Sequence, residues 1–372
     1  MKATQAKSLV ADLMHWNDER ATSEFAWLEL MVNYKFDRYQ QYGPGHRFYV
    51  HLLRWLSQFD LADRECAWRL LREQLVYVSQ DEMHHLVGLT GPLVERTMRA
   101  AIAKRLAMPV YRVQQDAHAM RQLDEMRCRT LYVGVSDGAR IDVFRRYNEG
   151  LINNEQVVPM IEISTKKQAS LKEKLQKRLN AMGSSAPATF EWVCLIDDFT
   201  ASGFTSIRKD ESGWDGKVHR FMEESAVVDG SSRLVAEQAH VMVHHYLASH
   251  GASQKVQSLL TDYEPHHPGV HFIASFTHVL PSEIVITTLS HPEVAALLQK
   301  RYDPSIENSH MGTNIALGYR KGGLPVVLAH NTPNNSVATL WAQSDPTKPN
   351  YIPANRMLPL FPRRQRHSDV RP

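Results

Sequence analysis

Residues 193–205 read VCLIDDFTASGFT. The four apolar residues at the start, 193–196, predict a short buried strand, and Asp197 and Asp198 fall at its carboxyl end. Small hydroxyl residues and a glycine follow over 200–205, which predicts a tight loop at the start of a helix. A buried strand, a loop and a helix in this order are typical of an α/β domain, in which ligands bind beyond the carboxyl ends of the strands.

The sequence on both sides of this stretch alternates in the same way. Short apolar or β-branched runs, mostly separated by helical patterns, span 130–135, 157–163, 191–196, 240–247 and 270–276, with a further strand at 324–329. This alternation predicts βαβ units and a mainly parallel sheet. The polar stretch 207–232 interrupts the alternation and is interpreted as a lid or as an ordinary insertion.

Residues 8–105 have a different pattern, in which apolar residues recur at helical spacing. Glycine and proline interrupt this pattern at 42–45 and at 90–92, so we expect several helices rather than one long rod. The sequence therefore predicts three parts. They are an N-terminal α-helical domain over 1–125, an α/β domain over 126–335, and an extended, proline-rich, basic tail over 336–372.

The composition excludes several classes of protein. The chain has 372 residues and a net charge of +3, too small to argue for nucleic-acid binding by itself, so direct contact with nucleic acid stays open. Cys66, Cys128 and Cys194 are too widely spaced for a disulfide framework or a thiolate zinc site. The longest apolar runs fall short of the ~18 residues that a membrane-spanning helix needs. Since the N-terminus also lacks the features of a secretory signal, we expect a cytoplasmic protein without a membrane segment.

The two aspartates and the loop after them suit one kind of ligand. Carboxylates at the end of a strand accept hydrogen bonds from sugar hydroxyls and support a Mg²⁺ ion, directly or through those hydroxyls. Backbone N–H groups and hydroxyls at a helix start bind an anion. The pattern thus points to a phosphorylated sugar. The alternative is a helix N-cap with a neighbouring solvated acid, which the two aspartates alone do not exclude.

The whole thirteen-residue pattern resembles the phosphoribosyl pyrophosphate (PRPP) signature of type I phosphoribosyltransferases. The resemblance implies a type I phosphoribosyltransferase-like fold and matches Asp197 and Asp198 to the acids that bind ribose. It matches the 5′-phosphate loop to Thr200, Ala201, Ser202, Gly203, Phe204 and Thr205. Ala201 stands where purine phosphoribosyltransferases carry an aspartate that serves the base, and an alanine cannot transfer a proton.

The same resemblance implies a loop that grips pyrophosphate after an earlier strand. The stretch after the strand 130–135 has the right placement, and the loop would consist of Ser136, Asp137, Gly138, Ala139 and Arg140. Arg140 offers a fixed positive charge and joins the two acids as a candidate catalytic residue; alternatively, it pairs with Asp142 of the following helix. Residues 134–138 also match Gly-x-Ser-x-Gly, the nucleophile motif of α/β-hydrolases, but a hydrolase would place several strands before that motif.

A narrower resemblance extends over more of the chain. Residues 54–60, 136–148, the Asp-Asp loop and 328–336 are similar to phosphoribosyltransferase-like proteins of bacterial conflict systems, found beside antiphage modules that include retron-type reverse transcriptases. This resemblance implies an effector in antiphage defence, with a protein or nucleoprotein partner. A turn after the strand 324–329 offers groups for a base or phosphate, unless its asparagines only cap a proline turn. Its residues are His330, Asn331, Asn334 and Asn335.

The sequence leaves two functional hypotheses. In the first, the chain is an enzyme that binds PRPP or a nucleotide with Mg²⁺ and acts at ribose C1′. In the second, the same pocket binds a nucleotide or a partner without turnover. The sequence does not identify the acceptor base, the trigger or the oligomeric state. His240, His244 and His245 are interpreted as packing residues, because three ligands cannot converge on a metal from one strand.

Overall fold

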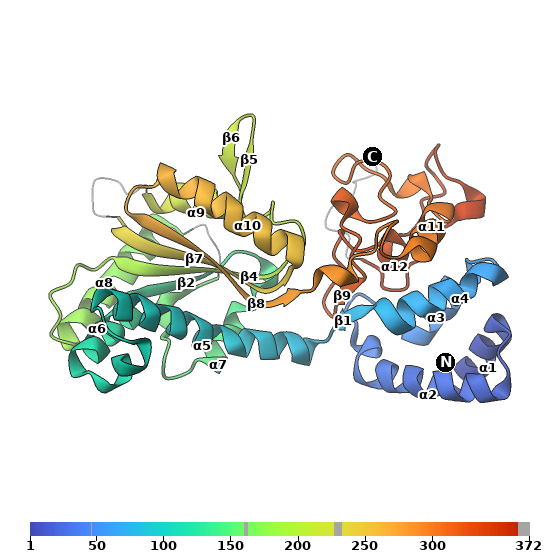
Figure 1. Cartoon of the computed structure of the whole chain (residues 1–372), viewed down its shortest axis with the longest axis horizontal. Coiled ribbons are helices and arrows are strands. Elements are labelled where there is room, and N and C mark those ends of the chain that lie inside the picture. The colour runs from blue at the N-terminus through green and yellow to red at the C-terminus, as the bar shows by residue number, and fades with distance from the viewer. Residues whose placement is uncertain (46, 160–162, 227–232, 364–372) are drawn as a thin grey trace. The chain divides into compact units, whose positions relative to one another are not determined.

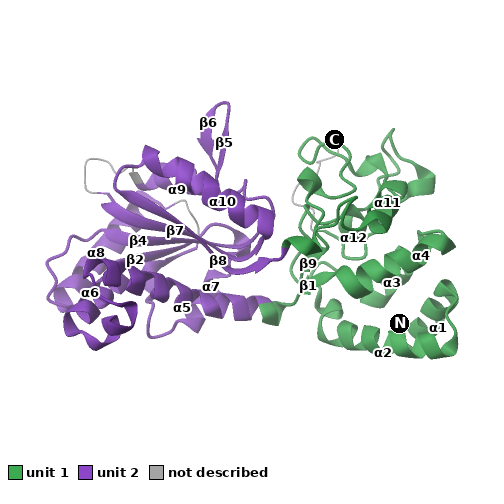
Figure 2. Cartoon of the chain, in the orientation of Figure 1, with its two compact units in different colours: residues 1–82, 282–372 green, residues 83–281 purple. Residues whose placement is uncertain are grey.

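The computed structural model describes residues 1–45, 47–159, 163–226 and 233–363 (Figure 1). The chain forms two compact units, which Figure 2 shows in different colours. Unit 1 combines residues 1–82 with 282–372, and unit 2 consists of residues 83–281. Each unit has its own hydrophobic core, as expected for a chain of this length.

Unit 2 is built around a five-stranded parallel sheet with the strand order β3-β2-β4-β7-β8 (Figure 1). The strands are β2 (Thr130–Gly134), β3 (Val157–Val158), β4 (Phe190–Thr200), β7 (Val235–Ser249) and β8 (Val270–Leu280). The register aligns Tyr132 of β2 with Cys194 of β4, and Cys194 with Met242 of β7. β4 is therefore the central strand, and its carboxyl end lies between those of β2 and β7.

Helices cover both faces of the sheet, which explains why the strands are apolar on both sides. They are α5 (Gln80–Arg105, in this unit from residue 83), α6 (Ala117–Cys128), α7 (Ile141–Tyr147), α8 (Thr165–Ala181), α9 (Lys217–Ala226) and α10 (His250–Tyr263). In Figure 1, α5 and α7 lie on one side of the sheet, and α9 and α10 lie on the other. Two neighbouring residues of β7 follow this division, since His244 contacts Thr90 of α5 whereas His245 contacts Ser206 on the opposite face.

The predicted mainly parallel α/β sheet is confirmed. Each of the five expected strands is present; the one expected at 157–163 is seen as β3, and residues 160–162 lie outside the described residues. The helix break expected at 90–92 is wrong, because α5 continues through Pro92. Proline removes one helical hydrogen bond, but the packing of this helix on the sheet, where the buried Thr90 hydroxyl lies 3.0 Å from the His244 Nε2, holds it in place.

Unit 1 is built from segments at both ends of the chain. Its elements are α1 (Ala3–Met14), α2 (Asp18–Tyr34), α3 (Phe48–Ser57), α4 (Leu61–Arg69), β1 (Val76–Val78), α11 (Pro292–Lys300), β9 (Val326–Leu328) and α12 (Ala338–Trp341). β1 pairs with β9 in parallel, so the strand expected at 324–329 belongs to this unit and not to the five-stranded sheet. Phe361 is fully buried here and packs against Phe36, Phe48 and Tyr77.

These units differ from the parts that the sequence suggested, 1–125, 126–335 and 336–372. Helices α5 and α6 lie with the sheet, and residues 282–335 pack with the N-terminal helices. The stretch expected to be an extended tail supplies Met357, Leu360 and Phe361 to the core of unit 1, because these apolar side chains complete that core. The end of the basic tail, residues 364–372, lies outside the described residues.

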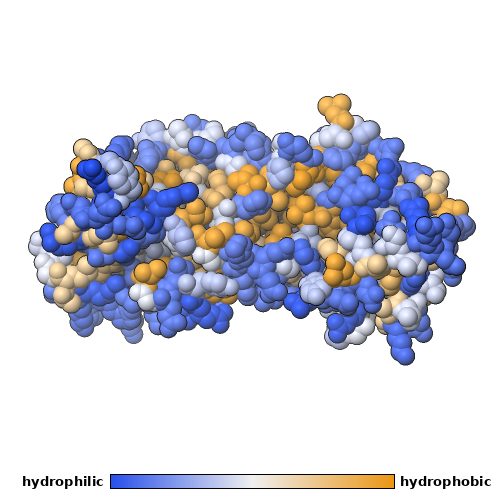
Figure 3. Space-filling model, turned by 60° about the horizontal axis from the view of Figure 1, so that its bottom comes forward, coloured by the Kyte–Doolittle hydropathy of each residue, from blue (hydrophilic) through white to orange (hydrophobic). Residues whose placement is uncertain are grey.

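The surface is of mixed polarity. On the face that Figure 3 shows, hydrophobic residues are interspersed with hydrophilic ones. Among the described residues, no helix is both long enough and apolar enough to cross a membrane. The three cysteines are free thiols, and Cys128 and Cys194 are buried.

Candidate functional site

The two aspartates lie within the central strand rather than after it. β4 extends to Thr200, four residues beyond the expected strand, and pairs Asp197 with His245 of β7. Because successive side chains of a strand point to opposite faces, Asp197 and Asp198 face different sides of the sheet. Asp197 is 5% exposed and Asp198 is half-buried, so the second acid is the more accessible one.

Asp197 is held by three hydrogen bonds. Its Oδ1 accepts from the Ser136 hydroxyl and from the Asp198 backbone N–H at 3.1 Å, and its Oδ2 accepts from the Lys217 Nζ at 2.5 Å. Burial raises the pKa of Asp197, while the positive charge of Lys217 opposes that rise. Both side chains of the ion pair are largely buried, and breaking such a pair by removing one partner costs about 3–5 kcal/mol.

The loop at 136–140 lies against both acids. Ser136 contacts Asp197, and a Cβ placed on Gly138 would lie 2.3 Å from the Asp198 Oδ2, so a larger residue there would force the loop or the acid to move. The Tyr246 hydroxyl donates to the backbone carbonyl of residue 139 at 2.6 Å and so fixes the loop from β7. The structure therefore brings the expected pyrophosphate loop and the expected ribose acids together.

Arg140 ends this loop in an unusual backbone conformation. Its φ of 46° and ψ of 39° place it in the left-handed region, which a residue with a side chain adopts at a cost. Burial raises the pKa of the nearby Tyr246, the charge of Asp198 raises it further, and the charge of Arg140 lowers it. The charges of Arg140 and Asp198 therefore both influence the pKa of the Tyr246 hydroxyl. Asp142 forms an ion pair with Arg146, one helical turn further on.

The segment 200–205 forms a tight loop that is held by two hydrogen bonds and packs against α10. The Thr200 Oγ1 accepts from the Gly203 N–H at 3.1 Å, and the backbone carbonyl of Ala201 accepts from the Ser249 hydroxyl at 2.8 Å. Gly203 has a φ of 78°, and a Cβ there would lie 3.2 Å from the Val256 Cγ2 of α10. Both the left-handed backbone at Gly203 and its close packing on α10 favour a glycine at this position.

Three polar groups of this loop region can receive a phosphate. The hydroxyls of Ser202 and Thr205 make no hydrogen bond to any described residue, and neither side chain is buried. Lys255 of α10 is exposed, packs against Gly203 and lies with its Nζ 5.6 Å from the centre of the Phe204 ring. Lys255 is a functional candidate that the sequence did not single out.

The helix expected directly after the loop is interrupted. One turn forms over 203–207, and then a hairpin of β5 (Arg208–Asp210) and β6 (Gly213–Asp215) intervenes before α9. The Lys217 N–H donates to the Thr205 carbonyl at 3.3 Å and the Val218 N–H to the Ser206 carbonyl at 2.9 Å. These are the bonds that a helix would make if the hairpin were removed, so the hairpin is an insertion in the first turn of a helix. The part of the expected insertion at 207–232 that the structure describes, residues 207–226, thus holds this hairpin and α9.

The insertion brings residues to the site that no sequence motif marked. Lys217 follows the hairpin and reaches Asp197, and the Ser206 hydroxyl lies 2.8 Å from the His245 Nε2. Burial and the charge of Lys217 lower the pKa of His245 to about 3, so its imidazole is neutral. These side chains line a small cavity of about 10 Å³, which has room for one water at most.

Comparison with known families gives the site a context. The sequence model of the PRTase-CE family matches residues 52–363, which include the whole sheet and both loops. The chain belongs to the PRTase-CE family. This family is phosphoribosyltransferase-like, so the fold that the resemblance implied is confirmed. No curated protein and no solved structure matches the chain significantly.

The remaining candidate residues of the PRTase-CE chain belong to a different unit from this loop cluster. His330, Asn331, Asn334 and Asn335 all belong to unit 1, whereas the acids belong to unit 2. The Asn335 side-chain amide donates to the Tyr319 carbonyl at 3.0 Å, and the residue is buried, which favours the interpretation as a turn residue.

Two alternative chemistries find no support in the PRTase-CE chain. Among the described residues, no group of three or more His, Cys, Asp or Glu side chains is arranged to hold a metal. Each of these histidines of β7 contacts a different group. His240 stacks on Trp192, and His244 forms hydrogen bonds with the hydroxyls of Thr90 and Ser275. The Ser136 hydroxyl donates to a carboxylate, whereas a hydrolase nucleophile would be bonded to a histidine base.

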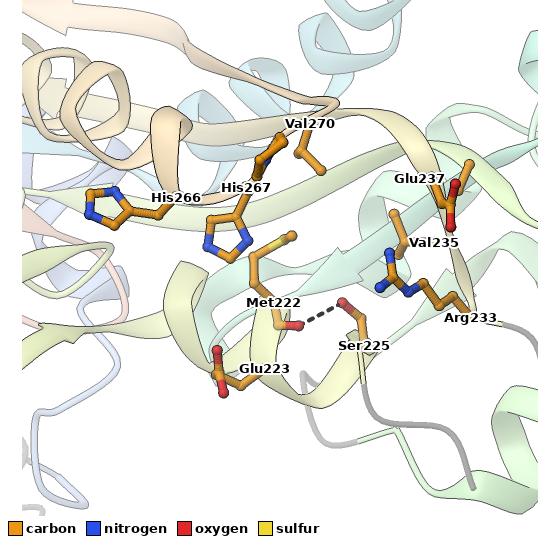
Figure 4. A pocket seen from close by; sticks show the side chains of 11 residues that line it. Met222, Glu223, Ser225, Arg233, Val235, Glu237, His266, His267 and Val270 are labelled. Atoms are coloured by element: carbon orange, nitrogen blue, oxygen red, sulfur yellow. Dashed lines mark hydrogen bonds between the residues drawn. The ribbon is translucent and has the colours of Figure 1, made fainter. Parts of the chain in front are cut away.

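A second, larger pocket of the PRTase-CE chain lies at the other edge of the sheet. It measures about 240 Å³ and is formed where β7 and β8 begin, with one wall from α9 (Figure 4). Met222, Val235 and Val270 are among its apolar lining residues, and Arg233 and Glu237 are charged. Because it lies at the amino ends of the strands, it is separate from the acids at the carboxyl ends.

Proposed function

We propose that this PRTase-CE protein binds the 5-phosphoribosyl group of PRPP or of a nucleotide at the carboxyl edge of its sheet, and acts at the ribose C1′. The observation that carries the proposal is the convergence of three features in unit 2. A half-buried carboxylate, Asp198, lies against Gly138 of the loop 136–140 and stands two residues before the loop 200–205. Such an arrangement offers acceptors for sugar hydroxyls and donors for a phosphate within one site.

The two acids take different roles in this proposal. Asp198 accepts hydrogen bonds from the ribose hydroxyls, because it is the accessible member of the pair. Asp197 fixes the ends of both loops through Ser136 and Lys217 and has one acceptor position left for a hydroxyl. The 5′-phosphate binds to Ser202, Thr205 and Lys255.

Pyrophosphate, if present, would lie on the loop 136–140. Arg140 and the backbone N–H groups of this loop would stabilise the negative charge that develops on the leaving diphosphate. Mg²⁺ bound to the diphosphate would supply further neutralisation as part of the substrate. The donor set fits this indirect role better than direct ligation, since three of the four acceptor positions of Asp197 are taken and Lys217 holds a positive charge there.

A second candidate function is binding without turnover. Ala201 lies at the position that serves the base in purine phosphoribosyltransferases, and a methyl group cannot move a proton. Asp197 is also already engaged by protein groups. These two observations favour a module that senses a nucleotide or docks a partner.

Titration calorimetry with PRPP and Mg²⁺ tests the proposal, followed by an assay of pyrophosphate release with each nucleobase. We expect binding by the wild type and a loss of at least about tenfold in Asp198→Asn, because a charge-assisted hydrogen bond is lost. Asp210→Asn, an exposed acid of the hairpin, is the matched control. Binding with release of pyrophosphate supports the enzyme, and binding without release supports the sensing module. Absence of binding would refute both.

We further propose a role in antiphage defence with a protein or nucleoprotein partner. The support is the resemblance of residues 54–60, 136–148 and 328–336 to proteins of bacterial conflict systems. Plaque counts on bacteria that express the chain with its genetic neighbours would test this role. We expect protection that Asp198→Asn abolishes and Asp210→Asn keeps; equal plaque counts with and without the wild-type chain would contradict it.

A further inference from the structure

The ion pair between Lys217 and Asp197 sits at the centre of the site. The Lys217 Nζ lies 2.5 Å from the Asp197 Oδ2, and the two side chains are 15% and 7% exposed. The pair forms because the hairpin insertion ends at residue 216 and Lys217 is the first residue of α9. Gly216 permits this close return, since a Cβ there would lie 2.8 Å from the Ser206 carbonyl oxygen.

The residues around the ion pair offer Asp197 one positively charged partner, Lys217. The cavity beside Asp197 is lined by Ser206, His245 and apolar side chains, and Lys217 is the one positively charged residue that lines it. His245 is fully buried, and its Nε2 is engaged with the Ser206 hydroxyl at 2.8 Å. The counter-charge of Asp197 on this face therefore comes from Lys217.

A lysine in this position competes with a divalent cation. Asp197 has about four acceptor positions, of which Ser136, the Asp198 N–H and Lys217 take three. A divalent ion at the fourth position would share Oδ2 with an ammonium group of like charge. A neutral ribose hydroxyl meets no such repulsion and can donate to that position.

We propose that Lys217 is a built-in counter-cation of Asp197, so that a 5-phosphoribosyl group binds at this site without a divalent metal at that acid. This inference rests on the proposed function and specifies the kind of ligand that the site accepts. A 5-phosphorylated ribose that lacks a diphosphate binds as well without Mg²⁺ as with it. Lys217 is a positioning residue in this role, since it acts on the ligand through Asp197.

The test compares two buffers with one ligand. Ribose 5-phosphate is titrated into the full-length wild-type chain by calorimetry, once with MgCl₂ and once with EDTA. We expect the two dissociation constants to agree within about twofold. The loss of one charge-assisted hydrogen bond would change the affinity by more than that. A loss of about tenfold or more in EDTA would overturn the inference while leaving the proposed function intact. No binding in either buffer would refute the proposed function itself.

Variants of Lys217 provide a second readout that a merely structural role would not move. Lys217→Met vacates the position at Asp197, so we expect its affinity for ribose 5-phosphate to become dependent on Mg²⁺, with about a tenfold difference between the buffers. Lys217→Arg keeps the charge and should remain independent of the metal. Lys209→Met, in the hairpin and packed over Trp214, is the matched control. If Lys217→Met folds and its affinity for ribose 5-phosphate is the same with and without Mg²⁺, the inference is contradicted. If this variant does not fold, the comparison of the two buffers with the wild type decides the question.

Discussion

Substitution of Gly203 by alanine tests the geometry of the 200–205 loop. Gly203 has a φ of 78°, a conformation that costs an alanine about 1–2 kcal/mol. The new Cβ would also lie 3.2 Å from the Val256 Cγ2, 3.3 Å from the Ala252 carbonyl oxygen and 3.4 Å from the Lys255 Cβ. Overpacking of this kind adds about 1–3 kcal/mol, so we expect the free energy of unfolding to fall by about 2–5 kcal/mol.

Gly251 provides the matched control for this substitution. It lies in the first turn of α10, has no left-handed backbone, and a Cβ there would meet nothing within 4 Å. Gly251→Ala should therefore raise the free energy of unfolding by about 0.5–1 kcal/mol. Urea unfolding followed by circular dichroism measures both variants, and calorimetry with ribose 5-phosphate measures the loop. Equal stability changes in the two variants, or unchanged affinity in Gly203→Ala, would refute the loop geometry described above.

Two further predictions follow from the same site. Gly138→Ala places a Cβ 2.3 Å from the Asp198 Oδ2, so the loop or the acid must move, and we expect ribose 5-phosphate affinity to fall by about tenfold in calorimetry; wild-type affinity would contradict the packing of this loop on the acid. Stability should also depend on pH. The pKa of His244 and of His245 is about 3 in the folded chain against 6.5 for an ordinary histidine, because both are buried. The unfolded state therefore binds the extra protons, and the unfolding free energy should decrease between pH 8 and pH 5.5 by about 1.4 kcal/mol for each histidine. His245→Gln should lose about half of that dependence in urea titrations, and an unchanged dependence would show that these histidines are not buried neutral.

The sheet could be predicted because each strand carries its own signal. The stretches 130–135, 191–196, 240–247 and 270–276 are apolar runs between helical patterns, and a strand covered on both faces needs that composition. The division into units could not be predicted in the same way. β1 and β9 are three residues each and pair across about 250 residues of sequence, which no local pattern records.

The site was predictable only in part. The acids and the two loops lie in short motifs, and the fold brings the loop 136–140 against both acids. Lys217 and Lys255 were missed because their positions depend on the third dimension. Lys217 reaches the acids only because a hairpin interrupts the first turn of a helix, and Lys255 lies on a helix that packs against Gly203. The alternation of side chains along β4, which gives the two acids different exposure, required the strand to continue past residue 196.

A crystal structure of the chain with ribose 5-phosphate tests the central claim most directly. We expect the phosphate on the loop 200–205, near Ser202, Thr205 and Lys255, and the ribose hydroxyls within hydrogen-bond distance of Asp198. Ligand bound at any other place, such as the pocket of Met222, Arg233 and Glu237 at the opposite edge of the sheet, with the carboxyl edge empty, would contradict the account.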